Sequence, residues 1–153
     1  MDLILWRHAE AQDPEGDMAD MERPLTRRGD KQAARMAAWL DRQLPEGTRI
    51  LCSPAVRTEQ TVRALGRKYR LVDEIRPGAS SEQLLRAAGW PDAKLPVLIV
   101  GHQPTLGETV SRLMHMAEPS CSVKKGAVWW LRNRERDAYR QTIVVTVQTA
   151  ELL

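Results

Sequence analysis

Apolar residues are distributed along this chain in two different patterns. Short, almost continuous apolar runs occur at Leu3–Trp6, Ile50–Cys52 and Leu95–Val100, and such runs are typical of strands covered on both faces of a sheet. Two longer segments, Thr26–Pro45 and Thr105–His115, carry apolar residues at intervals of three and four, which predicts amphipathic helices. Strands and helices therefore alternate through most of the chain.

Shorter elements are predicted between these segments. Ala9–Pro24 contains Asp, Pro and Gly without a clear period, which indicates a loop. Thr58–Lys68 is predicted to be a second helix and Leu71–Ile75 an extended segment. A serine and a glutamine spaced as a capping box predict a short helix over Glu82–Ala88, which ends at the glycine that follows.

The C-terminal part has a different pattern. Ala127–Leu131 and Gln141–Thr149 are predicted strands on either side of the charged turn region Asn133–Asp137, which indicates a hairpin. The preceding alternation predicts a three-layer α/β/α sandwich with a mostly parallel central sheet, which the hairpin makes mixed. The length of 153 residues, without a linker or an internal repeat, fits one domain over 1–153.

Composition and charge narrow the class of protein. Hydrophobic residues at 42% and charged residues at 28% are typical of a soluble globular chain, and no apolar stretch reaches the ~20 residues of a membrane span. The first apolar run ends at Arg7, too early for a signal peptide, and Cys52 and Cys121 form no CxxC motif, so we expect a cytoplasmic location. The net charge of +3 favours an acidic or phosphorylated partner, whereas no nucleic-acid-binding motif is present.

Arginine or histidine residues follow each of the three apolar runs. Arg7 and His8 follow the first run, Arg57 lies shortly after the second, and His102 follows the third. Ligands of open α/β sheets bind outside the carboxyl ends of the strands. If the three strands are parallel, two guanidinium groups and two imidazoles therefore converge on one crevice.

These four side chains suit the transfer of a phosphoryl group through a histidine. Two guanidinium groups can bind phosphoryl oxygens by both geometry and charge. An imidazole with a pKa near ~6.5 is available as a nucleophile at neutral pH. His102 can donate a hydrogen bond to the phosphoryl group if it is protonated, which Arg7 and Arg57 oppose and a bound phosphate favours.

Four segments resemble, in the same order, motifs of the histidine phosphatase superfamily, which includes acid phosphatases and phosphoglycerate mutases. They are LWRHAE at Leu5–Glu10, RPLTRRG at Arg23–Gly29, SPAVRTEQT at Ser53–Thr61 and VGHQP at Val100–Pro104. The small size and the RHAEA form look most like the SixA-type phosphohistidine phosphatases. Ala9 stands where most of the superfamily has Gly, and a backbone with positive φ would be strained there.

The resemblance implies a phosphoglycerate mutase-like fold and a role for each of the four side chains. His8 would be the catalytic nucleophile that becomes phosphorylated, and Arg7, Arg57 and His102 would bind the phosphate of the substrate. No metal or other cofactor is expected. The remaining histidine, His115, is predicted to be structural, because no HxxxH or CxxC spacing indicates a zinc site and paired arginines would repel the metal.

The proton donor is predicted from the same resemblance. Larger relatives use a Glu in an E-x-x-x-G stretch, and Glu74 begins such a stretch here, EIRPG. Glu82 and Glu10 are the alternatives. A phosphohistidine substrate can also dispense with a donor, because its leaving group is an imidazole rather than an alkoxide of high pKa.

The predicted function is that of a phosphohistidine protein phosphatase. The partner would be a phosphorylated histidine-phosphotransfer domain or phosphocarrier protein, and inorganic phosphate would be released. Little chain is available between Arg57 and His102 for a lid, and an open pocket suits a side chain presented by a protein. The alternatives are a small-molecule phosphomonoesterase of the same superfamily and a non-catalytic module that binds phosphoproteins; no nucleic acid or membrane partner is expected.

Overall fold

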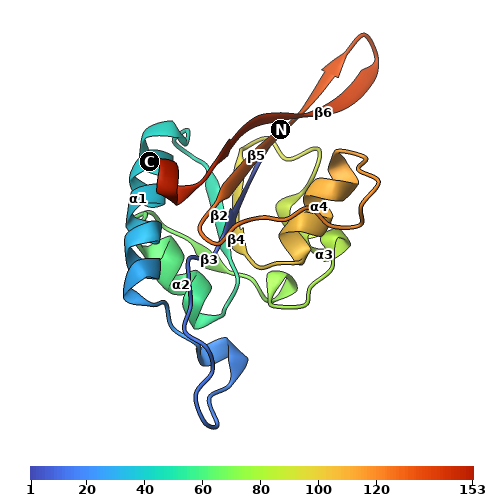
Figure 1. The fold of residues 1–153 in the computed structure, drawn as a ribbon. Helices are drawn as coiled ribbons and strands as arrows, with labels where there is room; N and C mark the ends of the chain where they lie inside the picture. Colours follow the sequence, from blue (N-terminus) through green and yellow to red (C-terminus); the bar gives the residue numbers. More distant parts are fainter.

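Six strands form one mixed sheet in the computed structural model, which describes residues 1–153. The strands are β1 (Asp2–Arg7), β2 (Arg49–Cys52), β3 (Arg70–Leu71), β4 (Val97–Gly101), β5 (Val128–Arg136) and β6 (Tyr139–Gln148). Their order is β3-β2-β4-β1-β5-β6 (Figure 1). The first four strands pair in parallel, and β5 and β6 add two antiparallel pairings, so the predicted mostly parallel sheet with a C-terminal hairpin is confirmed.

Helices cover both faces of the sheet (Figure 1). One face packs against α1 (Arg27–Gln43) and α2 (Val56–Arg63), and the other packs against α3 (Ser81–Ala88) and α4 (Thr105–Leu113). Three short 3-10 helices complete the fold: η1 (Asp20–Glu22), η2 (Asp73–Ile75) and η3 (Ala150–Leu152). None of the helices combines the length and apolar character needed to cross a bilayer.

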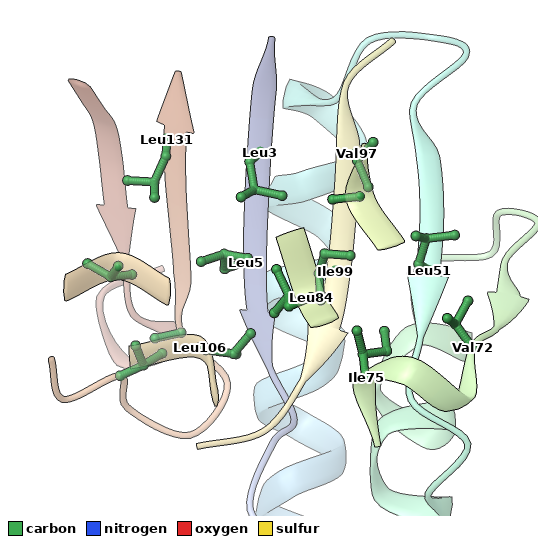
Figure 2. Packing of buried hydrophobic residues seen from close by; sticks show 14 residues of the cluster. Leu3, Leu5, Leu51, Val72, Ile75, Leu84, Val97, Ile99, Leu106 and Leu131 are labelled. Atoms are coloured by element: carbon green, nitrogen blue, oxygen red, sulfur yellow. The ribbon is translucent and has the colours of Figure 1, made fainter. Parts of the chain in front are cut away.

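Because helices cover both faces of the sheet, the sequences of its central strands are continuous apolar runs. In β1, Leu3 and Leu5 belong to the core cluster under α3 and α4, whereas Ile4 and Trp6 belong to the cluster under α1 and α2. Figure 2 shows the first cluster along β1, β4 and β2, whose arrows point the same way, with Leu84 contributed by α3. Each residue of these strands therefore has a buried environment, whichever face it points to.

Two predicted elements have different bounds in the structure. The prediction of an extended segment at Leu71–Ile75 is wrong for the second half of that range. The chain leaves the sheet after Leu71 and forms η2, in which Ile75 is buried. The second helix begins at Val56 rather than Thr58 and ends at Arg63.

The hairpin turn also lies further along the chain than predicted. The charged residues after Asn133 belong to β5, and the turn consists of Asp137 and Ala138, both with positive φ. A two-residue turn with this backbone is the type that matches the twist of two antiparallel strands. The tip of the hairpin projects beyond the layers (Figure 1), where charged residues can face water on either side.

Candidate active site

The register of the sheet aligns the ends of β1, β4 and β2. Arg7 lies opposite Gly101 on β4, and Cys52 of β2 lies opposite Val100. The first residues beyond the strands continue this pairing, since the His8 amide donates to the Gly101 carbonyl at 3.1 Å. The predicted convergence of the three strand ends is therefore present.

A hollow of about 270 Å³ lies at these strand ends. Its lining includes all four predicted arginine and histidine residues, and the three side chains of His8, Arg57 and His102 are buried, with no more than 6% of each residue exposed. The other residues that line it are Ala11, Asp13, Arg23, Pro77, Gln103 and Lys125. Four cations and two imidazoles therefore share a hollow with one carboxylate, an environment that attracts anions.

The His8 imidazole is held in a form that leaves one nitrogen free. Its Nδ1 donates a hydrogen bond to the Ala9 carbonyl at 2.7 Å. Burial lowers the pKa of His8 to about 3, and the charges of Arg57 and Arg7 contribute in the same direction, so the ring is neutral at pH 7. With the proton on Nδ1, the Nε2 atom carries a lone pair and can act as a nucleophile.

The His102 ring lies beside that of His8, with 5.4 Å between the ring centroids. Its Nε2 is 2.7 Å from the Ser53 hydroxyl, whereas its buried Nδ1 has no hydrogen-bond partner. Burial is the main cause that lowers the pKa of His102 to about 3, and the charge of Arg57 and the repulsion that a second imidazolium beside His8 would meet act in the same direction. If the Ser53 hydroxyl donates to Nε2, the neutral ring carries its proton on Nδ1, where an anion can accept it.

The two arginines retain unused hydrogen-bond donors. Arg57 donates from Nη1 to the Asp20 carbonyl at 2.7 Å and from Nη2 to the Asp20 carboxylate at 3.1 Å, and Arg7 donates from Nη1 to the Val123 carbonyl at 2.8 Å. The Nε atoms of both arginines are buried without a partner. Buried donors without partners are costly, and here they belong to three side chains that line one hollow, so the donor set fits a tetrahedral oxyanion.

Residues of the RPLTRRG and SPAVRTEQT segments hold the backbone that follows His8. The Thr61 hydroxyl accepts a hydrogen bond from the Ala9 amide at 3.1 Å and donates to the Arg57 carbonyl at 2.7 Å, so it connects both halves of the hollow. Gly29 lies so close to the Glu10 carbonyl that a side chain would collide with it. Ala9 does not have positive φ, so the expected strain at this position is absent.

The three candidate proton donors do not line the hollow. Glu74, the predicted donor, lies in η2 with an exposed side chain. Glu82 is exposed and pairs with Arg112 at 3.5 Å, and Glu10 accepts a hydrogen bond from Thr26 at 3.1 Å. The structure therefore brings together Arg7, His8, Arg57 and His102 and leaves Glu74 outside.

Four residues near the hollow were not predicted as site residues. Asp13 and Lys125 line it, Arg23 lies beside Arg57 and Asp20, and the Asp20 carboxylate binds the Arg57 guanidinium. Although partial burial opposes it, the hydrogen bond and the charge of Arg57 lower the pKa of Asp20. Arg23 belongs to a motif that was recognised, but the other three carry no sequence pattern that distinguishes them from surface charges.

The sheet order defines a phosphoglycerate mutase-like fold, and its hollow is lined by paired arginines and histidines. The family model described as the histidine phosphatase superfamily (branch 1) matches residues 3–80. The chain belongs to this superfamily.

Several relatives within the superfamily are similar over most of the chain. An uncharacterized protein of Mycobacterium tuberculosis is 36% identical over 104 residues, which are 65% of this chain and 63% of that protein. The phosphohistidine phosphatase SixA of Escherichia coli is 31% identical over 74% of each chain. This chain therefore spans somewhat less than two thirds of the first of these relatives.

Solved structures of SixA proteins share the fold. A phosphohistidine phosphatase SixA from Nakamurella multipartitia superposes with a TM-score of 0.77 at 28% identity, covering 96% of this chain and 94% of that one. A SixA protein histidine phosphatase complexed with tungstate superposes with a TM-score of 0.77 at 25% identity, covering 99% of each chain.

Proposed function

We propose that this protein is a phosphohistidine protein phosphatase that works through a phosphorylated His8. The observation that carries the proposal is the neutral His8 ring, whose unprotonated Nε2 shares a small hollow with three unpartnered donors. In the first step Nε2 forms a bond to phosphorus, and the bond between phosphorus and the partner's imidazole breaks. Water then attacks the phosphorus atom, the bond to Nε2 breaks, and inorganic phosphate leaves.

Arg7, Arg57 and His102 would stabilise the phosphoryl group during both steps. Charge develops on the equatorial oxygens in transfer reactions of this kind, so preorganised donors around them lower the barrier. A SixA protein of the same fold has been solved in complex with tungstate, which is itself an oxyanion, and this supports an oxyanion as the ligand. A bound phosphate would also favour protonation of His102, which then donates a charge-assisted hydrogen bond.

The size of the hollow supports a protein substrate. At about 270 Å³ it lies below the range of pockets that enclose a drug-sized ligand, so it fits a phosphoryl group and the ring that carries it while the rest of the partner stays outside. Similarity to phosphohistidine phosphatases favours an imidazole as that ring. The partner would then be a phosphotransfer domain or a phosphocarrier protein.

The decisive experiment looks for phosphate on His8. The protein is mixed with a histidine-phosphorylated phosphotransfer domain, quenched at neutral to alkaline pH and examined by mass spectrometry, while phosphate release is followed in parallel. We expect a phosphate on His8 and turnover that falls at least a thousandfold in His8→Ala. Binding of the phosphorylated domain without turnover, unchanged in His8→Ala, would instead identify a non-catalytic module.

A phosphomonoesterase acting on small molecules is the second candidate, and a panel of sugar phosphates and nucleotides compared by kcat/KM separates it from the first.

The same panel assigns the proton donor. Glu74 is the donor that the resemblance predicts, and Asp13 is the carboxylate that lines the hollow. Hydrolysis of such phosphate esters needs a proton on the leaving alkoxide, so the variant that removes the donor, Glu74→Gln or Asp13→Asn, should lose ester hydrolysis selectively.

A further inference from the structure

A second concavity, which we call the basic groove, adjoins the hollow. It has a volume of about 400 Å³ and lies between α1, the segment around Lys124 and η3, which Figure 1 shows beside α1. Its lining is Glu10, Arg28, Lys31, Gln32, Arg35, Lys124, Lys125, Thr149, Ala150 and Glu151. Lys125 lines both the groove and the hollow, so the two concavities are continuous on the surface.

The charges of the basic groove are only partly neutralised within the protein. Arg28 pairs with Glu10 at 3.8 Å and Lys124 pairs with Glu151. The other three cations, Lys31, Arg35 and Lys125, are exposed and form no ion pair. In addition, the buried Thr149 hydroxyl lacks a hydrogen-bond partner. The groove therefore offers three positive charges without an ion-pair partner, and one of them, Lys125, also lines the hollow that contains the proposed nucleophile.

The spacing of these charges indicates an extended ligand. Arg28, Lys31 and Arg35 follow one another along the same face of α1, and seven helical residues span about 10 Å. This distance is too long for the cations to surround a single phosphate, but it matches about three residues of an extended peptide. The lining contains no aromatic side chain on which a nucleobase could stack.

We propose that the basic groove binds an acidic stretch of the partner polypeptide close to its phosphorylated histidine. This inference rests on the proposed function, because the basic groove would be the surface by which the enzyme selects its protein substrate. Acidic side chains along the groove would orient the partner so that its phosphohistidine enters the hollow past Lys125. Three exposed ion pairs, each contributing a factor of about two, would favour such a partner by roughly tenfold at low salt.

Two synthetic peptides test the proposal. Each carries a central histidine phosphorylated with phosphoramidate, flanked by Asp and Glu in one peptide and by Asn and Gln at the same positions in the other. We expect the wild-type protein to hydrolyse the acidic peptide with a kcat/KM roughly tenfold higher at 50 mM salt, and the preference to shrink at 300 mM. Lys31→Glu combined with Arg35→Glu should abolish the preference while leaving hydrolysis of free phosphohistidine unchanged.

A second double variant, which changes the net charge of the protein by the same amount, serves as the control for an effect of net charge alone. Arg42→Glu combined with Lys68→Glu alters two exposed cations outside the groove and should keep the preference. Equal hydrolysis of both peptides by the wild-type protein would overturn the docking proposal and leave the proposed function standing.

If neither peptide is hydrolysed, the proposed function fails. Fluorescence anisotropy with the unphosphorylated acidic peptide then tests separately whether the basic groove binds acidic peptides. Binding that Lys31→Glu with Arg35→Glu removes would support the groove, and absence of binding would overturn it. Displacement of the acidic peptide by a nucleotide at equal concentration would reassign the groove to a small polyanion and also overturn the proposal.

Discussion

The environment of His8 reconciles two requirements on one side chain. A nucleophilic nitrogen must be unprotonated, yet it must approach a phosphoryl group among positive charges. Burial and the adjacent arginines both disfavour the imidazolium, and the Ala9 carbonyl fixes the remaining proton on Nδ1. The cations proposed to bind the phosphate therefore also favour the neutral form of the proposed nucleophile, which needs no separate general base.

Asp20 occupies the Arg57 donors that would bind a phosphate under the proposed function. Its carboxylate and carbonyl occupy both terminal nitrogens of the guanidinium, so an incoming anion competes with a charge of its own sign. Asp20→Asn should bind inorganic phosphate several-fold more tightly, as measured by calorimetry, and should lower the free energy of unfolding by about 1 kcal/mol, because Asp20 is more than half exposed. Weaker phosphate binding in Asp20→Asn would show instead that Asp20 holds Arg57 in its binding geometry.

At the scale of elements, the start of α1 fixes the loop that follows His8, the proposed nucleophile. The Thr26 amide donates to the Glu10 carbonyl at 3.0 Å, and Gly29 packs directly against the same carbonyl. The added methyl of Gly29→Ala has no space, because the atom it meets belongs to the backbone. We expect a loss of about 1–3 kcal/mol in urea unfolding and a lower kcat/KM for phosphohistidine hydrolysis.

The exposed Arg27, two residues before Gly29 on α1, provides the control for Gly29→Ala. Arg27→Ala adds no atoms at the first position of the same helix, so it should leave both the unfolding free energy and kcat/KM nearly unchanged. Full activity of Gly29→Ala would mean that the loop after His8 can move without disturbing the site.

The elements that were predicted well are those whose residues repeat a burial pattern. The apolar run at Leu95–Val100 could be recognised because β4 is covered on both faces, and the spacing of Ser80 and Gln83 because both halves of the capping box form. Leu71–Ile75 offered no such pattern, since β3 contains only two exposed residues. Tertiary contacts rather than local preference decide the conformation there.

The same distinction applies to the site. Arg7, His8, Arg57 and His102 were predictable because they stand at strand ends within recognisable motifs, and the sheet register then brings them together. The pairing of Asp20 with Arg57 joins positions 37 residues apart through a loop without periodicity, so no local pattern could indicate it.

For the whole molecule, the two buried imidazoles determine how stability depends on pH. Both have a pKa lowered to about 3 in the folded protein, whereas an unfolded histidine titrates near ~6.5. Below that pH the unfolded state binds more protons, so stability is full above about 6.5 and falls with decreasing pH. Between pH 7.5 and 5.5 each histidine should lower the free energy of unfolding by about 1.4 kcal/mol.

Urea unfolding at the two pH values measures this loss. His8→Asn and His102→Asn should each remove about half of it, and His115→Asn, a substitution of an exposed histidine outside the site, is the control. A loss that is the same in all four proteins would contradict the link between the site histidines and acid stability.

The pairing of β1 with β4 and β5 has a consequence for how the protein folds during its synthesis. Leu3 pairs with Val97 on one side and with Leu131 on the other, so β1 can complete its pairing only after strands much later in the chain have been synthesised. Nascent chains that end before β4 expose two unpaired apolar edges, which are prone to associate with other chains. The four residues proposed to bind the phosphoryl group are thus brought together only when β4 joins the sheet.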